Sequence, residues 1–372
     1  MHGQHPLRVL FVSSITSGGS GKSQRSLDDA LRSRGVETMM LVDNAVGATV
    51  TRFLHEQLWD ASVRFERRRI LGESASWLRS LPGRTPHRES GHVLVSPAPE
   101  NAFPDIALSF RPDVVVGSSI ARPAWRQIRE TCASLGLPAV LYLREETALA
   151  HLATGDHAAV IANSKTLTAG AAEHGVQAAL IPSIIDLEDS RIESTRERIL
   201  LVNPRKEHGV DIIEDLAQTF RTIEFVLQES WKLTPSEQRH VDGILRRHPN
   251  VCFRKRTTSP AEVFRDAAIV LAPHQIDNRP RTILEALGNG IPVIASDLPG
   301  LVESVGSGGI IASHASDWTN AITTLWQDPV VYRDYEQRAV AFSERSEVQT
   351  DQILDSFIDL IHETLVSERD AT

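Results

Sequence analysis

The sequence predicts an α/β protein made of two doubly wound domains, each with a parallel sheet covered by helices. Short apolar segments of the kind that form buried strands alternate with longer segments of helical periodicity. The same alternation begins again in the second half of the chain, and 372 residues are enough for about two domains. Short apolar strands separated by helices are typical of parallel sheets with both faces covered.

The first half opens with the apolar run Arg8 to Ser13, which predicts a buried strand. Leu27, Ala30 and Leu31 then share one face of a predicted helix, and Gly35 ends that helix. Further strands are expected at residues 38–42, 113–116, 139–143, 158–162 and 179–182.

The second half repeats this order, with strands expected at residues 199–202, 224–228, 251–253, 269–272 and 292–295. Between the first two of these, apolar residues at helical spacing predict a helix, and they are Ile212, Ile213, Leu216, Ala217 and Phe220. Another helix is expected to begin near Arg281 and to carry Glu285 in its first turn.

The charged, irregular segment 186–198 has the composition of a linker between the two halves. We therefore expect an N-terminal domain at residues 1–187 and a C-terminal domain at residues 188–349. The tail at residues 350–372 predicts a last helix, because apolar side chains recur at helical spacing in Ile353, Phe357, Leu360, Ile361 and Leu365.

Composition narrows the function classes. The hydrophobic fraction of 41% and the charged fraction of 23% are those of a soluble globular protein. A net charge of -9 argues against nucleic acid as the main partner. No apolar run approaches the roughly 18 residues of a membrane span, and the N-terminus lacks a signal-peptide layout, so a cytoplasmic location is expected. Cys132 and Cys252 lie in apolar surroundings and are expected to be reduced core residues.

The segment 58–88 is basic against this acidic background. Between Ala61 and Ser90, seven Arg against three Glu give a formal charge of +4. One interpretation is a peripheral contact with an anionic membrane at its inner face, or the docking of an acidic acceptor. The other is a solvated helix and loop.

The segment from Leu271 to Gly300 says most about function. An apolar strand runs into Pro273, a polar loop follows, and Asp277 and Glu285 lie on either side of the junction between loop and helix. A helix N-terminus offers unpaired N–H groups and a partial positive charge, which suit a phosphate, while the flanking carboxylates suit sugar hydroxyls. This combination predicts a site for a nucleotide sugar.

This segment resembles the donor site of glycosyltransferase family 4, whose members have a Glu, seven residues and a second Glu that Ala follows. Here Asp277 replaces the first Glu, Arg279-Pro280 replaces the family's Phe-Gly pair, and Glu285-Ala286-Leu287 keeps the pattern. The resemblance implies GT-B architecture, with two Rossmann-like domains facing across a cleft and a last helix that crosses back to the N-terminal domain.

The same resemblance implies a reaction. The chain would transfer a sugar, with retained anomeric configuration, from a nucleoside diphosphate sugar to a hydroxyl-bearing glycan, lipid or small molecule, without a cofactor or metal. Asp277 would touch the donor sugar and Glu285 would hold the ribose hydroxyls. Neither an Asp-x-Asp motif nor a His/Cys cluster with metal-ligand spacing occurs in the sequence.

The family's diphosphate is held by an Arg that follows a Gly after the first strand of the second domain, and by a Lys just before a later Gly. Here residues 203–209 read Asn-Pro-Arg-Lys-Glu-His-Gly. Arg205 and Lys206 are the expected diphosphate contacts, and Arg281 and the backbone N–H of Thr282 are expected to join them.

The acceptor side is expected in the first domain. Arg144-Glu145 stands where many family members have His-Asp, so Arg144 is expected to stabilise the leaving group and Glu145 to orient the acceptor hydroxyl. Gly18 and Gly19 are expected in a flexible loop that lets substrate approach the backbone. His151 is expected at a helix surface.

Three alternatives stay open. Ser17 to Ser23 resembles a P-loop whose Lys22 would meet a phosphate, but Thr16 stands where that motif needs its first Gly. The second alternative is an epimerase of nucleoside diphosphate sugars, which shares GT-B architecture. The third is a degenerate member that binds nucleotide sugars and transfers nothing.

Overall fold

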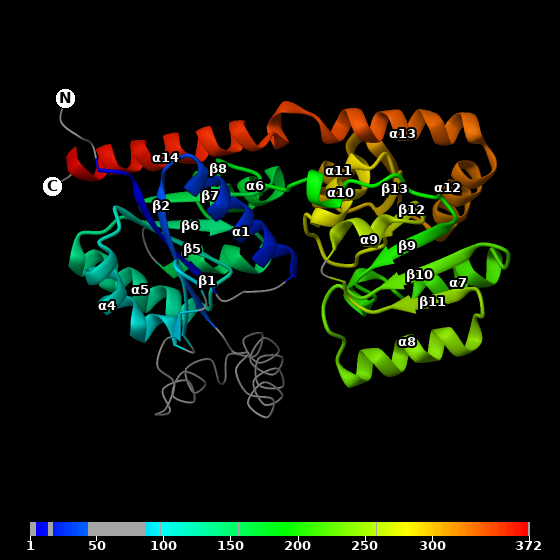
Figure 1. Ribbon diagram of the computed structural model, residues 1–372, viewed down its shortest axis with the longest axis horizontal. Helices are drawn as coiled ribbons and strands as arrows, with labels where there is room; N and C mark the ends of the chain where they lie inside the picture. Colours follow the sequence, from blue (N-terminus) through cyan, green and yellow to red (C-terminus); the bar gives the residue numbers. More distant parts are fainter. Residues whose placement is uncertain are drawn as a thin grey trace. The chain divides into compact units, whose positions relative to one another are not determined.

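The computed structural model describes residues 5–13, 18–43, 87–88, 90–96, 98–154, 157–257 and 259–370. The chain divides into two compact units, and each consists of a central sheet with helices packed on it (Figure 1). Unit 1 comprises Met1–Asn163, Leu167–Ile181 and Leu354–Thr372, and unit 2 comprises Ser164–Thr166 and Pro182–Ile353. The boundaries expected at residues 187 and 349 stay predictions.

The sheet of unit 1 has eight strands and is parallel except where β3 meets β4. In spatial order the strands are β3 (His87–Arg88), β4 (Val93–Ser96), β2 (Glu37–Asp43), β1 (Arg8–Ser13), β5 (Val114–Ser118), β6 (Ala139–Leu143), β7 (Ala159–Ala162) and β8 (Ala179–Leu180). The chain adds β2 on one side of β1 and later adds β5 on the other side. Such a reversal is where ligands of doubly wound sheets bind, outside the carboxyl ends of the strands.

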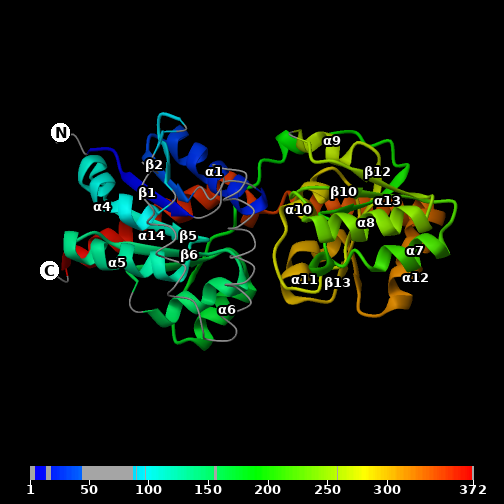
Figure 2. The same ribbon diagram turned by 90° about the horizontal axis from the view of Figure 1, so that it is seen from below.

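Helices cover both faces of this sheet (Figure 2). They are α1 (Gly18–Ser33), α4 (Pro99–Phe110), α5 (Arg122–Leu135), the 3-10 helix η1 (Glu146–Thr154), α6 (Lys165–Glu173) and α14 (Thr350–Asp370). Strands β5 and β6 are buried along their whole length because both of their faces are covered. Gly117 in β5 leaves room for the indole of Trp125, since a Cβ at this position would lie 2.4 Å from that ring.

The last helix predicted from the sequence is present and belongs to unit 1 from Leu354 onward. Its predicted apolar face is buried at Ile353, Phe357 and Ile361. The ring centroid of Phe357 lies 6.3 Å from that of Phe11 in β1, so the two ends of the described chain share one core.

The sheet of unit 2 has six strands, all parallel. In spatial order they are β11 (Val251–Arg254), β10 (Glu224–Gln228), β9 (Arg198–Val202), β12 (Ala267–Ala272), β13 (Val293–Ser296) and β14 (Gly309–Ala312). The chain adds β10 and β11 on one side of β9 and then crosses over to add β12 on the other. The reversal of this sheet therefore lies between β9 and β12.

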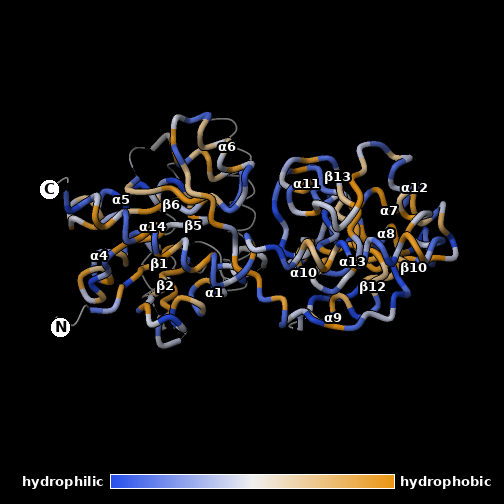
Figure 3. Tube along the Cα trace, turned by 90° about the horizontal axis from the view of Figure 1, so that it is seen from above, coloured by the Kyte–Doolittle hydropathy of each residue, from blue (hydrophilic) through white to orange (hydrophobic). Residues whose placement is uncertain are grey.

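Seven α-helices of unit 2 lie in the described chain: α7 (Ile212–Thr219), α8 (Pro235–Arg247), α9 (Pro260–Phe264), α10 (Arg281–Gly288), α11 (Pro299–Val305), α12 (Ala315–Gln327) and α13 (Pro329–Ser343). Short 3-10 turns accompany them at η2 (Glu188–Ser190), η3 (Lys206–His208), η4 (Gly306–Gly308) and η5 (Ser346–Val348). Figure 3 shows that hydrophobic residues concentrate in the strands of both units, where the buried cores lie.

The strands expected from the sequence are confirmed to within two residues at each end. The sequence analysis missed β4, β14 and the two-residue β3, which lie at or next to sheet edges. The expected linker at residues 186–198 is not a free connection. The Asn289 side chain holds it to unit 2 by donating to the carbonyl of Ser190 and accepting from the N–H of Ile192, both within 2.8 Å.

The two cysteines are free thiols. Cys132 is buried, and burial raises the pKa of its thiol to about 12, so it is an inert core residue as expected. Cys252 is partly buried in β11, and burial raises the pKa of its thiol also. Among the helices in the described part of the chain, none combines the length and apolar character that crossing a membrane requires.

Candidate functional site

The reversal between β9 and β12 brings two loops together at the carboxyl edge of the unit 2 sheet. Residues 203–211 follow β9, and residues 273–280 follow β12. The N–H of Gln275 in the second loop donates to the carbonyl of Glu207 in the first at 2.9 Å. Gly209 has φ +74°, and a Cβ there would lie 1.8 Å from the carbonyl oxygen of Pro273. The loops are therefore in direct contact, and only glycine fits at residue 209.

Helix α10 begins at this edge and carries a buried ion pair. The Arg281 Nε donates to Glu285 Oε1 at 3.3 Å, and the two side chains are only 10% and 8% exposed. Arg281 also donates from Nη1 to the carbonyl of Ile184 at 3.3 Å. Helix α10 begins at Arg281, as expected, but Glu285 is its fifth residue, so its expected place in the first turn is wrong because one turn takes only 3.6 residues.

The N-terminus of α10 has no side-chain cap. Pro280 occupies the N-cap position, where no side-chain hydrogen bond is formed to the first turn. The N–H of Thr282 precedes the first intrahelical hydrogen bond and so points along the positive end of the helix dipole. This end of α10 has the features of an anion site, with the Glu285–Arg281 pair one turn behind it.

Asp277 has a structural contact that the sequence did not indicate. Its Oδ1 accepts the N–H of Gly300 at 2.8 Å, so its carboxylate caps the first turn of α11 from a different loop. A Cβ at Gly300 would lie 2.7 Å from the same oxygen and 2.8 Å from the carbonyl oxygen of Asn278. The contact with a donor sugar that was expected of Asp277 stays a prediction.

We expect Asp277→Ala to lower the free energy of unfolding of unit 2 by about 1 kcal/mol, because the Gly300 N–H loses its acceptor. Asp277→Asn keeps an amide oxygen at the same place and is expected to change the stability by less than about 0.5 kcal/mol. Urea unfolding of both variants measures the difference. An Asn variant as unstable as the Ala variant would show that the charge, and not the hydrogen bond, stabilises this turn.

Arg205 and Lys206 differ in their surroundings. Arg205 donates to the carbonyl of Lys232 at 3.2 Å and lies within 3.7 Å of carboxylate oxygens of Glu207 and Glu237. Lys206 is exposed. The structure therefore directs Arg205 toward the start of α8, while Lys206 faces solvent, and their diphosphate contacts stay predictions.

In unit 1, Arg144 lies at the carboxyl edge of the sheet and is 7% exposed. Its guanidinium donates to Ser118 Oγ at the end of β5 at 2.9 Å and to Gln24 Oε1 in α1 at 3.3 Å. The guanidinium also lies over the ring of Tyr142, with Cζ 4.1 Å from the ring centroid. These contacts place Arg144 beside the reversal between β1 and β5, whereas Glu145 is exposed.

The glycines of the expected flexible loop lie in a helix instead. Helix α1 begins at Gly18, so Gly18 and Gly19 form its first turn and the loop assignment is wrong. Lys22 is then the fifth residue of α1 and exposed, which does not favour the P-loop interpretation.

His151 is another difference from expectation. It is 6% exposed rather than at a helix surface, and burial lowers the pKa of its imidazole to about 4, with the Arg122 charge acting in the same direction.

Sequence reasoning also missed a pair of histidines at the reversal of unit 2. The ring centroids of His208 and His274 are 4.6 Å apart. His208 was visible only as one of several basic residues before Gly209, and no spacing in the sequence links it to His274, because the contact between the two loops is tertiary.

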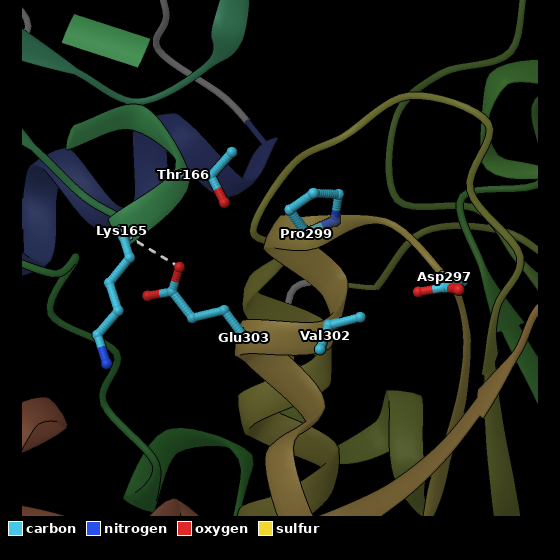
Figure 4. A pocket seen from close by; sticks show the side chains of 6 residues that line it. All are labelled: Lys165, Thr166, Asp297, Pro299, Val302 and Glu303. Atoms are coloured by element: carbon cyan, nitrogen blue, oxygen red, sulfur yellow. Dashed lines mark hydrogen bonds between the residues drawn. The ribbon is translucent and has the colours of Figure 1, made fainter. Parts of the chain in front are cut away.

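An open hollow lies elsewhere in unit 2, beside α11. Figure 4 shows the six side chains that line it, which are Lys165, Thr166, Asp297, Pro299, Val302 and Glu303. A hydrogen bond joins two of these residues, from the N–H of Lys165 to Glu303 Oε2 at 2.9 Å. Helix α11 follows β13, so this hollow is one strand away from the reversal between β9 and β12.

No group of three or more His, Cys, Asp or Glu side chains that could hold a metal occurs in the ranges that the structure describes. The absence of a metal from the mechanism stays a prediction. The basic segment at residues 58–88, with its expected membrane contact, lies almost wholly outside the described residues.

Comparison with known proteins agrees with this geometry. Residues 216–328, all within unit 2, match a family model described as glycosyl transferases group 1. This stretch contains the loop after β12 and the whole of α10. No curated protein sequence matches the chain.

Solved structures show the fold. A sucrose-phosphate synthase from Thermosynechococcus elongatus has a TM-score of 0.75 at 15% identity, over 97% of this chain and 100% of that chain. Anabaena HepE in complex with UDP-glucose has a TM-score of 0.71 at 16% identity, over 97% of this chain and 100% of that chain. A UDP-GlcNAc 2-epimerase from Neisseria meningitidis has a TM-score of 0.60 at 13% identity, over 96% of this chain and 100% of that chain. The two Rossmann-like units have the GT-B fold that glycosyltransferases of this architecture share.

Proposed function

We propose that this chain is a glycosyltransferase that moves a sugar from a nucleoside diphosphate sugar to a hydroxyl acceptor. The buried Glu285–Arg281 pair behind the uncapped N-terminus of α10 carries the proposal. A carboxylate held in this way can accept hydrogen bonds from ribose hydroxyls, while the N–H groups of the helix end receive the diphosphate. The family match over residues 216–328 and the fold shared with a UDP-glucose complex support it.

The reaction would depend on stabilising the departing nucleoside diphosphate, which gains negative charge in the transition state. Fixed N–H groups and cations aimed at that charge lower the barrier. The N-terminus of α10 and Arg281 supply both in unit 2, and Lys206 is an exposed cation within the loop that follows β9. From unit 1, Arg144 would meet the leaving group, and Glu145 with the Gly18–Gly19 turn would meet the acceptor.

We further propose that the anomeric configuration is retained and that no metal takes part. The sequence motifs offer no clear nucleophile for a covalent intermediate. A same-face displacement, in which the acceptor hydroxyl attacks from the side of the departing diphosphate, is then the simpler route. NMR of the first product formed would give the configuration of the new linkage.

The experiment that tests the proposal is a thermal-shift screen of UDP-, GDP-, ADP- and dTDP-glucose, followed by a transfer assay with the strongest binder. A ligand at 100 times its Kd stabilises the native state by about 2.7 kcal/mol, which raises the Tm by a few degrees. Transfer to a mixed pool of hydroxyl acceptors is then followed by release of the nucleoside diphosphate. Absence of both stabilisation and donor turnover would contradict the proposal.

Two related functions are distinguished by the same assay. The similarity to a UDP-GlcNAc 2-epimerase favours conversion of a nucleotide sugar without an acceptor, which product analysis of acceptor-free reactions would reveal. Pro204 and the engagement of Arg205 with Glu237 favour a protein that binds a nucleotide sugar without turnover. Binding without transfer, hydrolysis or conversion would identify that function.

A further inference from the structure

Two histidines to which the proposed function assigns no role lie on the loops that meet at the reversal of the unit 2 sheet. His208 ends η3 after β9, and His274 is the second residue after β12. Their ring centroids are 4.6 Å apart with 34° between the ring planes. The close approach of Gly209 to Pro273 fixes the two loops beside each other, so this pairing of rings is built into the backbone.

Hydrogen bonds fix which nitrogen of each ring carries the hydrogen. Nδ1 of His208 lies 3.1 Å from the carbonyl oxygen of Asn203, and a carbonyl can only accept, so Nδ1 donates. The amide nitrogen Nδ2 of Asn203 lies 2.8 Å from the same nitrogen, and two donors cannot face each other. Rotating this amide by 180° brings Oδ1, which otherwise lacks a partner among the described residues, to Nδ1 as a second acceptor, and we assign the amide in that orientation. Nδ1 of His274 lies 2.9 Å from Oδ1 of Asn278 and donates to it.

It follows that Nε2 of each neutral ring bears a lone pair and no hydrogen. Within the described ranges, neither Nε2 atom has a recorded hydrogen-bond partner, and neither is among the fully enclosed polar atoms. The pair thus presents two nitrogen atoms that can accept a hydrogen bond at once, but can donate one only after protonation.

Both rings are neutral in the protein without ligand. Burial lowers the pKa of His274 to about 4, and the neighbouring His208 contributes in the same direction. Burial also lowers the pKa of His208, where the charge of Arg205 adds to this effect while Glu207 and, from α8, Glu237 oppose it. The loop after β12 contributes one titratable group that faces His208, and this group is His274.

We propose that His208 and His274 form a further diphosphate contact of the donor site, beside the N-terminus of α10, and that the pair takes up one proton from solvent when a nucleoside diphosphate sugar binds. This inference rests on the proposed function. Diphosphate oxygens only accept hydrogen bonds, so a contact through Nε2 requires an N–H there, and Nδ1 already carries its own hydrogen. The added proton makes the ring an imidazolium, which supplies the positive charge that the family's Lys before this Gly would supply permanently.

One proton, not two, is expected because the rings are adjacent and two imidazolium charges at this separation repel each other. The pKa of the free pair lies below the ordinary histidine value, and the bound diphosphate raises it. Binding therefore strengthens as the pH falls from the bound-state pKa toward the free-state pKa. Over that interval a full proton linkage changes the affinity by about ten-fold per pH unit.

The test is calorimetric titration of the full chain between about pH 5.5 and 8.5 with the strongest binder among UDP-, GDP-, ADP- and dTDP-glucose. A sugar-linked diphosphate suits this range, because it lacks the terminal phosphate whose second pKa of about 6 would titrate within it. Titrations in two buffers of different ionisation heat give the number of protons taken up. We expect uptake approaching one proton for the wild type.

Substitutions show whether the proton is taken up by the His208–His274 pair or by another histidine. His208→Gln and His274→Gln are each expected to weaken binding at pH 6 by about ten-fold or more and to flatten the pH dependence. His208→Lys restores a permanent cation, so at pH 8.5 it is expected to bind about ten-fold more tightly than the wild type and without proton uptake. His240→Gln is the control. Nε2 of His240 in α8 lies 2.7 Å from Asp211 Oδ1, and His240 is not part of the His208–His274 ring contact, so the calorimetric titration of this variant should give the wild-type affinity and proton uptake.

Each outcome decides the inference. Binding of a sugar nucleotide by the wild type with no proton uptake, or an unchanged pH dependence in both Gln variants, would overturn it and leave the proposed function standing. Failure of all four sugar nucleotides to bind at every pH would overturn both. If a Gln variant does not fold, the gain of affinity in His208→Lys at pH 8.5 supports the inference, and lack of that gain refutes it.

Discussion

Glu285→Ala is expected to abolish the thermal stabilisation that the best nucleoside diphosphate sugar gives to the wild type. The carboxylate is 6% exposed and fixed by Arg281, so its geometry toward two ribose hydroxyls is set before the ligand arrives. Hydrogen bonds to a charged acceptor are each worth about 1.5–3 kcal/mol. Losing them should weaken binding by about 100-fold or more.

The control for this variant is Glu214→Ala in α7. Glu214 also forms an ion pair within unit 2, to Arg247 at 2.6 Å, but it is far more exposed and belongs to a different part of the unit. Its response to the ligand should equal that of the wild type. Equal responses from Glu285→Ala and Glu214→Ala would show that the donor does not bind at α10.

Gly209→Ala is expected to destabilise unit 2 by more than about 4 kcal/mol, which few single substitutions do. A methyl group at this position would lie 1.8 Å from the carbonyl oxygen of Pro273, and φ +74° adds the strain of a left-handed residue. The two site loops would have to separate to relieve the overlap. Urea unfolding, or the loss of soluble protein on expression, measures the effect.

Gly175→Ala isolates the part of this effect that comes from backbone conformation. Gly175 has φ +73°, nearly the same as Gly209, and no atom lies within 4 Å of a Cβ added there. The expected cost is about 1 kcal/mol. Similar costs for the two substitutions would mean that the loops are not held in contact at Pro273.

Much of the fold was predictable because the buried strands are apolar along their length. Strand β6 was predicted at its observed bounds, since both faces of the sheet are covered there and its sequence AVLYL is apolar and buried throughout. Strands β4 and β14 were missed because strands near a sheet edge are short and only half buried, so their apolar signal is weak.

The candidate site was predictable in its position and only partly in its contacts. The pattern around Glu285 placed a carboxylate near a helix N-terminus, and the structure confirms that it lies in α10 with Arg281 against it. The hydrogen bond from Gly300 to Asp277 joins residues 23 apart in sequence, and no local pattern encodes it. The contact between the rings of His208 and His274 was hidden for the same reason.

The position of Glu285 along α10 alters the interpretation of the motif. The helix begins at Arg281, as predicted, but Glu285 is its fifth residue and falls behind the first turn rather than within it. A carboxylate in the first turn would itself occupy the positive end of the helix. Its observed place leaves that end open to a ligand's own negative charge.

The return of α14 to unit 1 constrains the order in which the molecule can be completed on the ribosome. Residues 354–372 leave the tunnel only after the whole of unit 2 has been made, yet Phe357 fills a place against Phe11 in the first strand. Until then, the surface of the nascent unit 1 that α14 later covers, including Phe11, stays exposed. Chaperones or neighbouring chains can bind this apolar surface during that interval. The completion of unit 1 therefore depends on the synthesis of unit 2.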